Sequence, residues 1–307
     1  MRILLTGGGG MVGRHISESP ETLRHQLFTP SSSELDLLDS QCVDEWINSV
    51  RPDLIIHAAG YVGGIQANIN EPVRFLVDNF QMGFNLIRAS YKSGIKKFIN
   101  LGSSCMYPRN GANPLREEMI LKGELEPTNE AYALAKISVA RLCAYIEKEN
   151  KSFRYKTLIP CNIYGPYDKF DPSCAHMVPS IIHKLHLAKH NGLNTVDIWG
   201  DGVARREFMY AGDLAAAVWF AVDRYENIPL LMNIGCGSDL TVNEYYRVIA
   251  SVIGYEGTFI HDLSKPVGMS QKLVSIERVK QLGWQSKVGL KEGIDKTYNY
   301  YLKEIQK

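Results

Sequence analysis

A run of glycines directly after the first apolar segment constrains the fold of this chain more than any other feature. Arg2–Leu5 has the pattern of a buried strand, and the stretch T-G-G-G-G-M-V-G at 6–13 leads from it into a helix. Each of three glycines has its own role in this pattern. A sharp turn is permitted by Gly7, close approach of the backbone to a pyrophosphate by Gly10, and tight packing of the helix on the strand by Gly13. Amide groups at the helix N-terminus favour phosphate. The pattern predicts a dinucleotide-binding unit.

Apolar runs and segments of helical periodicity alternate through the first half of the chain. The expected strands are Arg2–Leu5, Gln26–Phe28, Asp53–Ile56, Lys97–Leu101 and Tyr155–Ile159. The main expected helices are Asp39–Ser49, Glu71–Lys92 and Asn129–Lys148. This alternation is typical of a parallel sheet with helices on both faces, and nearly all-apolar strands fit a sheet covered on both sides. We predict an α/β fold with a doubly wound parallel sheet of the Rossmann type.

Shorter elements follow Pro160. The expected strands there are Thr195–Ile198, Met232–Ile234 and Gly257–Ile260, and the expected helices are Ala211–Arg224, Val242–Ile253, Ser275–Leu282 and Leu290–Ile305. They indicate a smaller, discontinuous C-terminal α/β lobe. We assign residues 1–165 to the dinucleotide-binding domain, with a returning segment at about 195–225. Residues 166–307 are assigned mostly to a substrate-binding lobe.

Composition excludes several classes of partner. Charged residues make up 22% of the chain and the net charge is +1, so neither nucleic acid nor a membrane surface is an expected partner. No apolar stretch approaches the roughly 20 residues of a membrane helix. The first strand begins directly after Met1, which leaves no room for a signal peptide, and a cytoplasmic location is expected.

A metal site is not expected. None of the six cysteines forms a C-x-x-C pair, so neither a zinc site nor a disulfide framework is indicated. His183, His186 and His190 share a helical spacing but lack accompanying carboxylates or cysteines. We interpret them as a solvated helix face.

The end of the second strand bears on the choice of cofactor. An NAD site usually has an acidic residue there for the ribose 2′-hydroxyl, whereas this chain has T-P-S-S-S at 29–33. Hydroxyl groups and a nearby cation can instead accept a 2′-phosphate, and Arg14 is the best placed cation. The stretch favours NADP(H), with the alternative that Arg14 is a solvent-facing helix residue.

Tyr132 and Lys136 stand four residues apart, so their side chains share one face of a helix. An ammonium group beside a tyrosine favours the phenolate and is expected to lower its pKa from about 10 toward the working range. Ser103, at the end of an apolar run, can hold a carbonyl oxygen. Together these groups predict a proton-relay site that reduces a ketone or oxidises an alcohol.

Several longer motifs carry a family resemblance. They are H-A-A-G-Y-V-G-G-I at 57–65, L-G-S-S-C-M-Y-P at 101–108, E-P-T-N-E-A-Y-A-L-A-K at 126–136, N-I-Y-G-P at 162–166 and R-R-E-F at 205–208. With them the chain resembles the extended short-chain dehydrogenase/reductase family. Within that family it looks most like the epimerase-reductases that act on a GDP-linked 4-keto-6-deoxy sugar.

The resemblance implies a reductase triad of Ser103, Tyr132 and Lys136, with Cys105 and His176 as an acid/base pair for epimerisation. A ketone at C4 acidifies the protons on C3 and C5, and inversion requires two groups on opposite faces of the sugar. Cysteine and histidine both exchange protons near neutral pH. The alternatives are that Cys105 is a buried filler and that His176 only opens a helix.

The resemblance also implies the residues that bind each ligand. NADP(H) would be contacted by Gly7, Gly10, Met11, Val12, Gly13, Arg14, Ala58, Ala59, Lys136 and His176. The GDP-sugar would be contacted by Asn162, Lys184, Trp199, Arg206 and Lys272. For Trp199, a place in the core of the lobe is an equal alternative. A homodimer formed by the helices Glu71–Lys92 and Asn129–Lys148 is expected as well.

Three residues depart from the family pattern and leave the exact sugar open. Lys184 stands where arginine is common, and Cys161 and Cys174 replace polar residues. The precursor of colitose (a 3,6-dideoxy sugar) or a 6-deoxy-heptose would use the same machinery, with one or both epimerisations absent. A non-catalytic NADP-sensing scaffold is a further alternative, against which the intact Ser103, Tyr132 and Lys136 argue.

Overall fold

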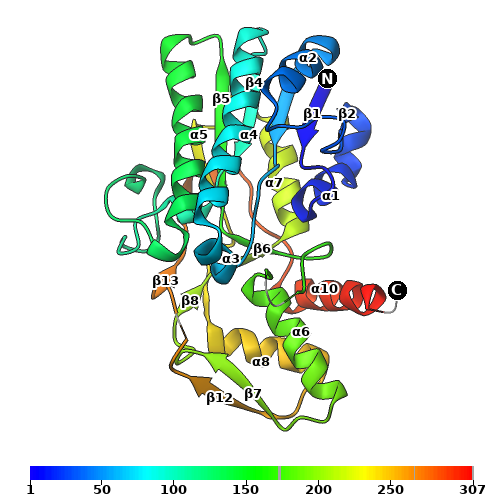
Figure 1. The fold of residues 1–307 in the computed structure, drawn as a ribbon, viewed down its shortest axis with the longest axis vertical. Coiled ribbons are helices and arrows are strands. Elements are labelled where there is room, and N and C mark those ends of the chain that lie inside the picture. The colour runs from blue at the N-terminus through cyan, green and yellow to red at the C-terminus, as the bar shows by residue number, and fades with distance from the viewer. Residues whose placement is uncertain (172–173, 266, 306–307) are drawn as a thin grey trace.

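The computed structural model describes residues 1–171, 174–265 and 267–305. Its upper part in Figure 1 is a six-stranded, wholly parallel sheet in the order β10-β5-β4-β3-β1-β2. The strands are β1 Arg2–Thr6, β2 Gln26–Phe28, β3 Leu54–His57, β4 Lys97–Leu101, β5 Arg154–Pro160 and β10 Leu231–Ile234. The predicted doubly wound α/β fold is therefore confirmed.

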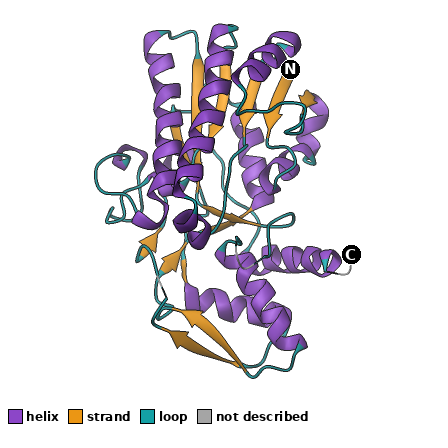
Figure 2. Cartoon of the chain, viewed as in Figure 1, coloured by secondary structure: helices purple, strands orange, loops and turns teal. Residues whose placement is uncertain are grey.

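Alternate residues of the strands enter two separate apolar cores, one on each face of the sheet. Leu4 and Ile55 point into the core that is closed by α2 (Ser40–Val50), α4 (Pro72–Lys92) and α5 (Glu130–Glu149). Their neighbours Leu5 and Ile56 point into the core closed mainly by α1 (Met11–Ser17) and α7 (Ala211–Asp223). Figure 2 shows the helices packed along the sheet. Burial on both faces explains why these strands lack polar alternation.

The lower part contains three small sheets and a third apolar core. Parallel pairs are formed by β6 (Asn162–Tyr164) with β9 (Phe208–Tyr210) and by β7 (Thr195–Trp199) with β12 (Thr258–Asp262). The third sheet joins β11 (Leu240–Thr241), β8 (Arg205–Arg206) and β13 (Gln271–Lys272). The lower helices are α6 Met177–His190, α8 Val242–Ile253 and α10 Leu290–Glu304.

The remaining elements are short. The α-helices α3 and α9 span Ile65–Asn70 and Glu277–Gln281, and the 3₁₀ turns are Pro20–Arg24, Ser104–Met106, Glu117–Met119 and Pro127–Asn129. Among the described residues, no helix is both long and apolar enough to cross a membrane.

The returning segment expected at about 195–225 divides between the two parts of the molecule. Its helix, α7, contacts α1 beside the large sheet. Its strand, β7, instead pairs with β12 at the far end of the lower part. The sixth strand of the large sheet is β10, which lies next to β5 and is formed by a segment that the sequence analysis had placed in the lobe. Partner choice between short apolar strands depends on distant residues, and a local pattern does not encode it.

Candidate active site

The glycine turn between β1 and α1 brings two backbones together. Gly7 has a φ of +75°, and a Cβ on it would lie 2.6 Å from the backbone nitrogen of Ala59. A Cβ on Gly13 would overlap the carbonyl of Gly7. Gly10 is the N-cap residue of α1, and because it has no side chain, no side-chain hydrogen bond caps the first amides of the helix. The turn is therefore a bare cradle of amides into which a phosphate group can approach.

Arg14 lies on the exposed side of α1, close to this turn. Its Nε donates to the carbonyl of Gly9 at 3.3 Å, and its guanidinium carbon lies 4.8 Å from the ring centroid of Tyr167. At the end of β2, the carboxylate of Glu34 accepts hydrogen bonds from the backbone N–H and the hydroxyl of Ser31, both at 2.8 Å. Glu34 lies just beyond the stretch 29–33 from which the cofactor was predicted, so the stretch did not reveal this carboxylate.

Ser103 and Cys105 meet at the carboxyl end of β4. The Ser103 Oγ lies 3.0 Å from the Cys105 Sγ and accepts a hydrogen bond from the Cys105 backbone N–H at 3.3 Å. Ser103 is the N-cap of the 3₁₀ turn Ser104–Met106, so the turn itself sets this geometry. A hydroxyl and a thiol thus lie side by side where a parallel sheet presents its ligand-binding edge.

Tyr132 and Lys136 lie on the first turns of α5, as the spacing predicted. The Lys136 Nζ donates to the backbone carbonyl of Leu101 at 3.0 Å and lies 5.7 Å from the ring centroid of Tyr132. Leu101 ends β4, two residues before Ser103. This bond anchors the helix that carries Tyr132 to the strand that carries Ser103.

The expected effect of Lys136 on Tyr132 was wrong. Burial raises the pKa of Tyr132, and the nearby Cys105 raises it further. Burial also lowers the pKa of Lys136 to about 8. Desolvation is the main cause at both groups, and the Lys136 ammonium donates to the Leu101 carbonyl. Tyr132 is therefore held in its protonated form, the state from which it can donate a proton.

His176 is the half-buried N-cap residue of α6. Burial lowers its pKa, and the positive charges of Lys169 and Lys272 lower it further, which favours the neutral imidazole. The segment before it is attached to the 60–64 loop. The Gly64 N–H donates to the carbonyl of Cys174 at 3.0 Å, and a Cβ on Gly64 would lie 2.5 Å from the carbonyl oxygen of Ala175.

Arg206 and Lys272 are neighbours in the three-stranded sheet, where they form a register pair between β8 and β13. Burial lowers the pKa of both side chains. Cys105 and Glu126 oppose this effect at Lys272, which places Lys272 within electrostatic reach of the thiol. The two cations therefore belong to the same group as Ser103 and Cys105.

Lys184 and Trp199 lie apart from that group, on α6 and β7. The Lys184 Nζ forms an ion pair with the Asp197 carboxylate at 2.9 Å and donates to the Asp197 carbonyl at the same distance. Trp199 is 44% exposed, with the Nζ of Lys265 at 5.5 Å from its ring centroid. Exposure of the indole argues against the core position that was its alternative.

Asn162 connects two of the lower sheets. Its side-chain amide donates to the backbone carbonyl of Glu207 at 2.8 Å. It therefore lies beside the strand that carries Arg206.

Sequence reasoning missed three acidic residues, two of which lie near these groups. Glu126 faces Arg206 and Lys272, and Glu207 is fully buried next to Arg206. Burial raises the pKa of Asp168 to about 7, and its Oδ2 has no hydrogen-bond partner among the described residues. Glu126 and Glu207 lie inside the motifs quoted above, which was the available signal.

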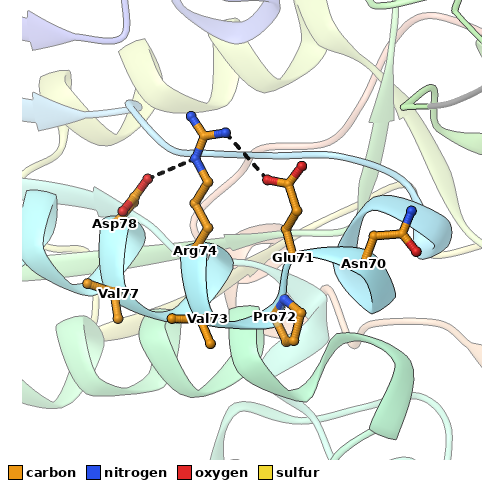
Figure 3. Close-up of a pocket in the computed structure, with 7 residues that line it drawn as sticks. All are labelled: Asn70, Glu71, Pro72, Val73, Arg74, Val77 and Asp78. Atoms are coloured by element: carbon orange, nitrogen blue, oxygen red, sulfur yellow. Dashed lines mark hydrogen bonds and ion pairs between the residues drawn. The ribbon is translucent and has the colours of Figure 1, made fainter.

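A hollow of about 500 Å³ at the start of α4 lies outside the predicted site. Figure 3 shows Arg74 between Glu71 and Asp78, at 3.4 and 3.2 Å, while Val73 and Val77 point to another side of the helix. None of the residues that line the hollow was predicted to bind a ligand. Within the described chain, no group of three or more His, Cys, Asp or Glu side chains is placed to hold a metal ion.

Comparison with known proteins identifies the family. Residues 3–235 match the NAD dependent epimerase/dehydratase family, and the chain belongs to it. The chain is 53% identical over 304 residues to "GDP-L-colitose synthase" of Yersinia pseudotuberculosis, with 99% of each chain covered. It is 47% identical over 301 residues to "GDP-L-fucose synthase" of Azorhizobium caulinodans, with 98% and 96% covered.

A solved structure gives the same picture. The GDP-mannoheptose C4 reductase MlghC of Campylobacter jejuni, determined with NADP bound, superposes with a TM-score of 0.87. It is 27% identical and covers 98% of each chain. The resemblance to nucleotide-sugar epimerases and reductases that the motifs indicated is thereby confirmed.

The pKa of Lys136 gives a first prediction. A native pKa of about 8 lies below that of an unfolded lysine, so the unfolded state binds more protons between about pH 8 and 10. As the pH increases over that range, the free energy of unfolding of the unchanged protein should increase, relative to that of Lys136→Met, by up to about 3 kcal/mol. Urea denaturation of both proteins at each pH measures this difference. A difference that does not vary with pH would contradict the burial of a charged Lys136.

Proposed function

We propose that this chain is an NADPH-dependent 3,5-epimerase/4-reductase of a GDP-linked 4-keto-6-deoxy-hexose. The observation that carries the proposal is the meeting of Ser103 and Cys105, 3.0 Å apart, at the edge to which Lys136 anchors the Tyr132 helix. The names of the two relatives and the full-length match support the substrate class.

The glycine turn fits a dinucleotide. Gly7 and Gly13 let the backbones of the turn, of α1 and of Ala58 and Ala59 pack closely, whereas a Cβ on Gly9 would meet nothing within 4 Å, so the turn is open at Gly9. Met11, Val12 and Arg14 lie on the same turn of α1. NADPH bound in this cradle would supply a hydride to C4 of the sugar. NADP bound in the related C4 reductase supports the phosphorylated cofactor.

The reduction requires a proton at the C4 oxygen. Ser103 and Tyr132 can both donate hydrogen bonds to that oxygen and stabilise the charge that develops on it. Because burial keeps Tyr132 protonated, its hydroxyl delivers the proton as the C4 alkoxide forms. Lys136 is held by its bond to the Leu101 carbonyl, and in this proposal it also contacts the nicotinamide ribose.

Epimerisation uses the same oxygen. Removal of a proton from C3 or C5 leaves an electron pair that delocalises onto the C4 oxygen, where Ser103 and Tyr132 stabilise it. Cys105 and the neutral imidazole of His176 serve as the two groups that remove the proton and return one on the other face. Arg206 and Lys272 supply positive charge for the diphosphate, and Asn162, Lys184 and Trp199 complete the GDP side.

A second candidate substrate is the 3,6-dideoxy analogue. The 53% identity to a GDP-L-colitose synthase favours it. Such a sugar has no hydroxyl at C3, so only C5 can be inverted. In a C4 reductase of a GDP-heptose, as the relation to MlghC suggests, no carbon need be inverted. In each case residues 1–165 would bind the cofactor and 166–307 mostly the sugar nucleotide.

Product analysis in heavy water distinguishes these candidates. The protein is incubated in D2O with NADPH and either GDP-4-keto-6-deoxy-mannose or its 3-deoxy analogue, and the product is analysed by NMR. Tyr132→Phe should lower kcat for reduction by about a hundredfold or more, since it removes the proton donor, with NADPH affinity nearly unchanged. Cys105→Ser should lower deuterium incorporation at C5 by about a hundredfold.

Three outcomes would contradict the proposal. A product without deuterium at C3 and C5 would rule out epimerisation and leave a plain reductase. Full activity of Tyr132→Phe would remove that residue from the mechanism. No turnover of any GDP-4-keto sugar would favour a non-catalytic scaffold.

We propose further that two copies pair through α4 and α5, in the cytoplasm. The two helices lie side by side on the sheet; α4 exposes an apolar stripe at helical spacing, and α5 exposes two large apolar side chains. The stripe on α4 consists of Val73, Val77, Phe80 and Phe84, and the two side chains on α5 are Leu134 and Tyr145. Such a face suits an isologous interface. All six cysteines are free thiols, which suits a reducing compartment.

Phe80→Glu tests the pairing. A charge buried against the partner would be unpaired, so the variant should sediment as a monomer at micromolar concentration while the unchanged protein sediments at twice that mass. Leu187→Glu is the matched control, because Leu187 is 41% exposed on α6, away from these helices. An unchanged protein that is monomeric, or a dimeric Phe80→Glu, would contradict the proposal.

A further inference from the structure

Glu207 is a fully buried carboxylate between β8 and β9. Its Oε1 accepts hydrogen bonds from the backbone N–H groups of Cys236 at 2.6 Å and Gly237 at 2.8 Å. Its Oε2 accepts one from the N–H of Val274 at 2.9 Å. No lysine or arginine in the described part of the chain pairs with it. Three backbone amides therefore hold this side chain.

The three donors come from segments that are distant in the sequence. Cys236 and Gly237 follow β10, the edge strand of the large sheet, and Val274 follows β13. In Figure 1, β8 and β13 lie between the large sheet and the lower elements β7, β12 and α8. The Glu207 side chain is thus a junction between the cofactor-side sheet and the strand that carries Lys272.

The backbone of Glu207 extends this junction to two further site residues. Its N–H donates to the carbonyl of Lys272 at 3.2 Å, and its carbonyl accepts the side-chain amide of Asn162 at 2.8 Å. Arg206 is its direct neighbour in the chain. Arg206, Lys272 and Asn162 are therefore arranged around one residue that does not itself face the predicted ligand.

The strands at this junction are too short to hold their own position. β8, β11 and β13 have two residues each, whereas stable strands usually have at least three. Gly235 shows how closely the parts approach, since a Cβ on it would overlap the Glu207 Oε1 and lie 2.8 Å from the Val274 side chain. Bonds from outside the strand ladder therefore help to hold the Lys272 segment, from Leu115 and Asn113 as well as from Glu207.

We propose that Glu207 is a positioning residue that fixes Arg206 and Lys272 for the diphosphate of the GDP-sugar. This inference rests on the proposed function. An ionised carboxylate suits the task because it only accepts hydrogen bonds and offers two oxygens to three N–H groups. Burial raises the pKa of Glu207 to about 7, so the titrations are made at about pH 8.5, where the ionised form predominates. A glutamine has one acceptor oxygen, so its amide group would face at least one N–H donor. The segment that carries Lys272 would then lose one of the hydrogen bonds that hold it.

Calorimetric titration with GDP, which needs no turnover, tests the inference on the full chain. Glu207→Gln should raise the Kd for GDP about tenfold, the effect of losing one hydrogen bond to a charged group. The Kd for NADPH should change by less than about twofold, since the glycine turn is not attached to Glu207. In turnover assays KM for the GDP-sugar should rise more than kcat falls.

Asp213→Asn is the matched control. The buried Asp213 carboxylate on α7 also accepts backbone N–H groups, from Lys287 at 3.1 Å and Val288 at 2.9 Å, but it makes no bond to β8, β11 or β13. Its Kd for GDP should equal that of the unchanged protein. Gly235→Ala is a milder second variant, which displaces the Glu207 carboxylate without replacing it and should also weaken GDP binding.

The outcomes distinguish failure of the positioning role of Glu207 from failure of the proposed function. GDP affinity that is unchanged in Glu207→Gln and in Gly235→Ala would overturn the positioning role. Equal weakening of GDP and NADPH binding would also overturn it, because that pattern indicates general loss of structure. If the unchanged protein binds NADPH but not GDP, the proposed function fails first, and this inference with it.

Discussion

The hydrogen bond from the Lys136 ammonium to the Leu101 carbonyl joins the two elements on which the candidate site depends. One end lies on α5, one turn from Tyr132, and the other is the last residue of β4, just before Ser103 and Cys105. The bond carries a buried positive charge, so it is retained only because the carbonyl replaces lost water. Tyr132, Ser103 and Cys105, the proposed proton donor and its two neighbours, are therefore held by two elements that this bond joins.

The predicted cations of the site form an electrostatic environment that is costly without an anionic ligand. Burial lowers the pKa values of Lys136, Arg206 and Lys272. The loss of hydration therefore destabilises each positive charge by more than nearby acidic groups stabilise it. The negative charge of Glu126 raises the pKa of both Arg206 and Lys272 and so opposes the effect of burial. A diphosphate would supply the missing negative charge. Lys184, in contrast, is already paired with Asp197, so a phosphate has to compete for it.

Local patterns predicted the local structure well. The bounds expected for Lys97–Leu101 and Val242–Ile253 are those of β4 and α8. The conformation of the glycine turn was also predictable, because the requirement for glycine comes mainly from the local backbone, as with the φ of +75° at Gly7 and the contact of Gly13 with Gly7. The two-residue strands β8, β11 and β13 were not predicted, since they have no periodicity and depend on distant partners. The pKa of Tyr132 was missed for a related reason: sequence spacing reveals a neighbouring charge but not the depth of burial.

The link between Gly64 and the segment before His176 has a consequence for how such proteins diversify. The 60–64 loop leaves the cofactor-side sheet, whereas α6 belongs to the lower part, and one backbone hydrogen bond joins them. If His176 takes the proposed role, changes elsewhere in the lower part can alter sugar binding while this bond keeps the segment before His176 attached to the 60–64 loop. The fold separates recognition, which is free to vary, from proton transfer, which is held by main-chain atoms that substitution cannot remove.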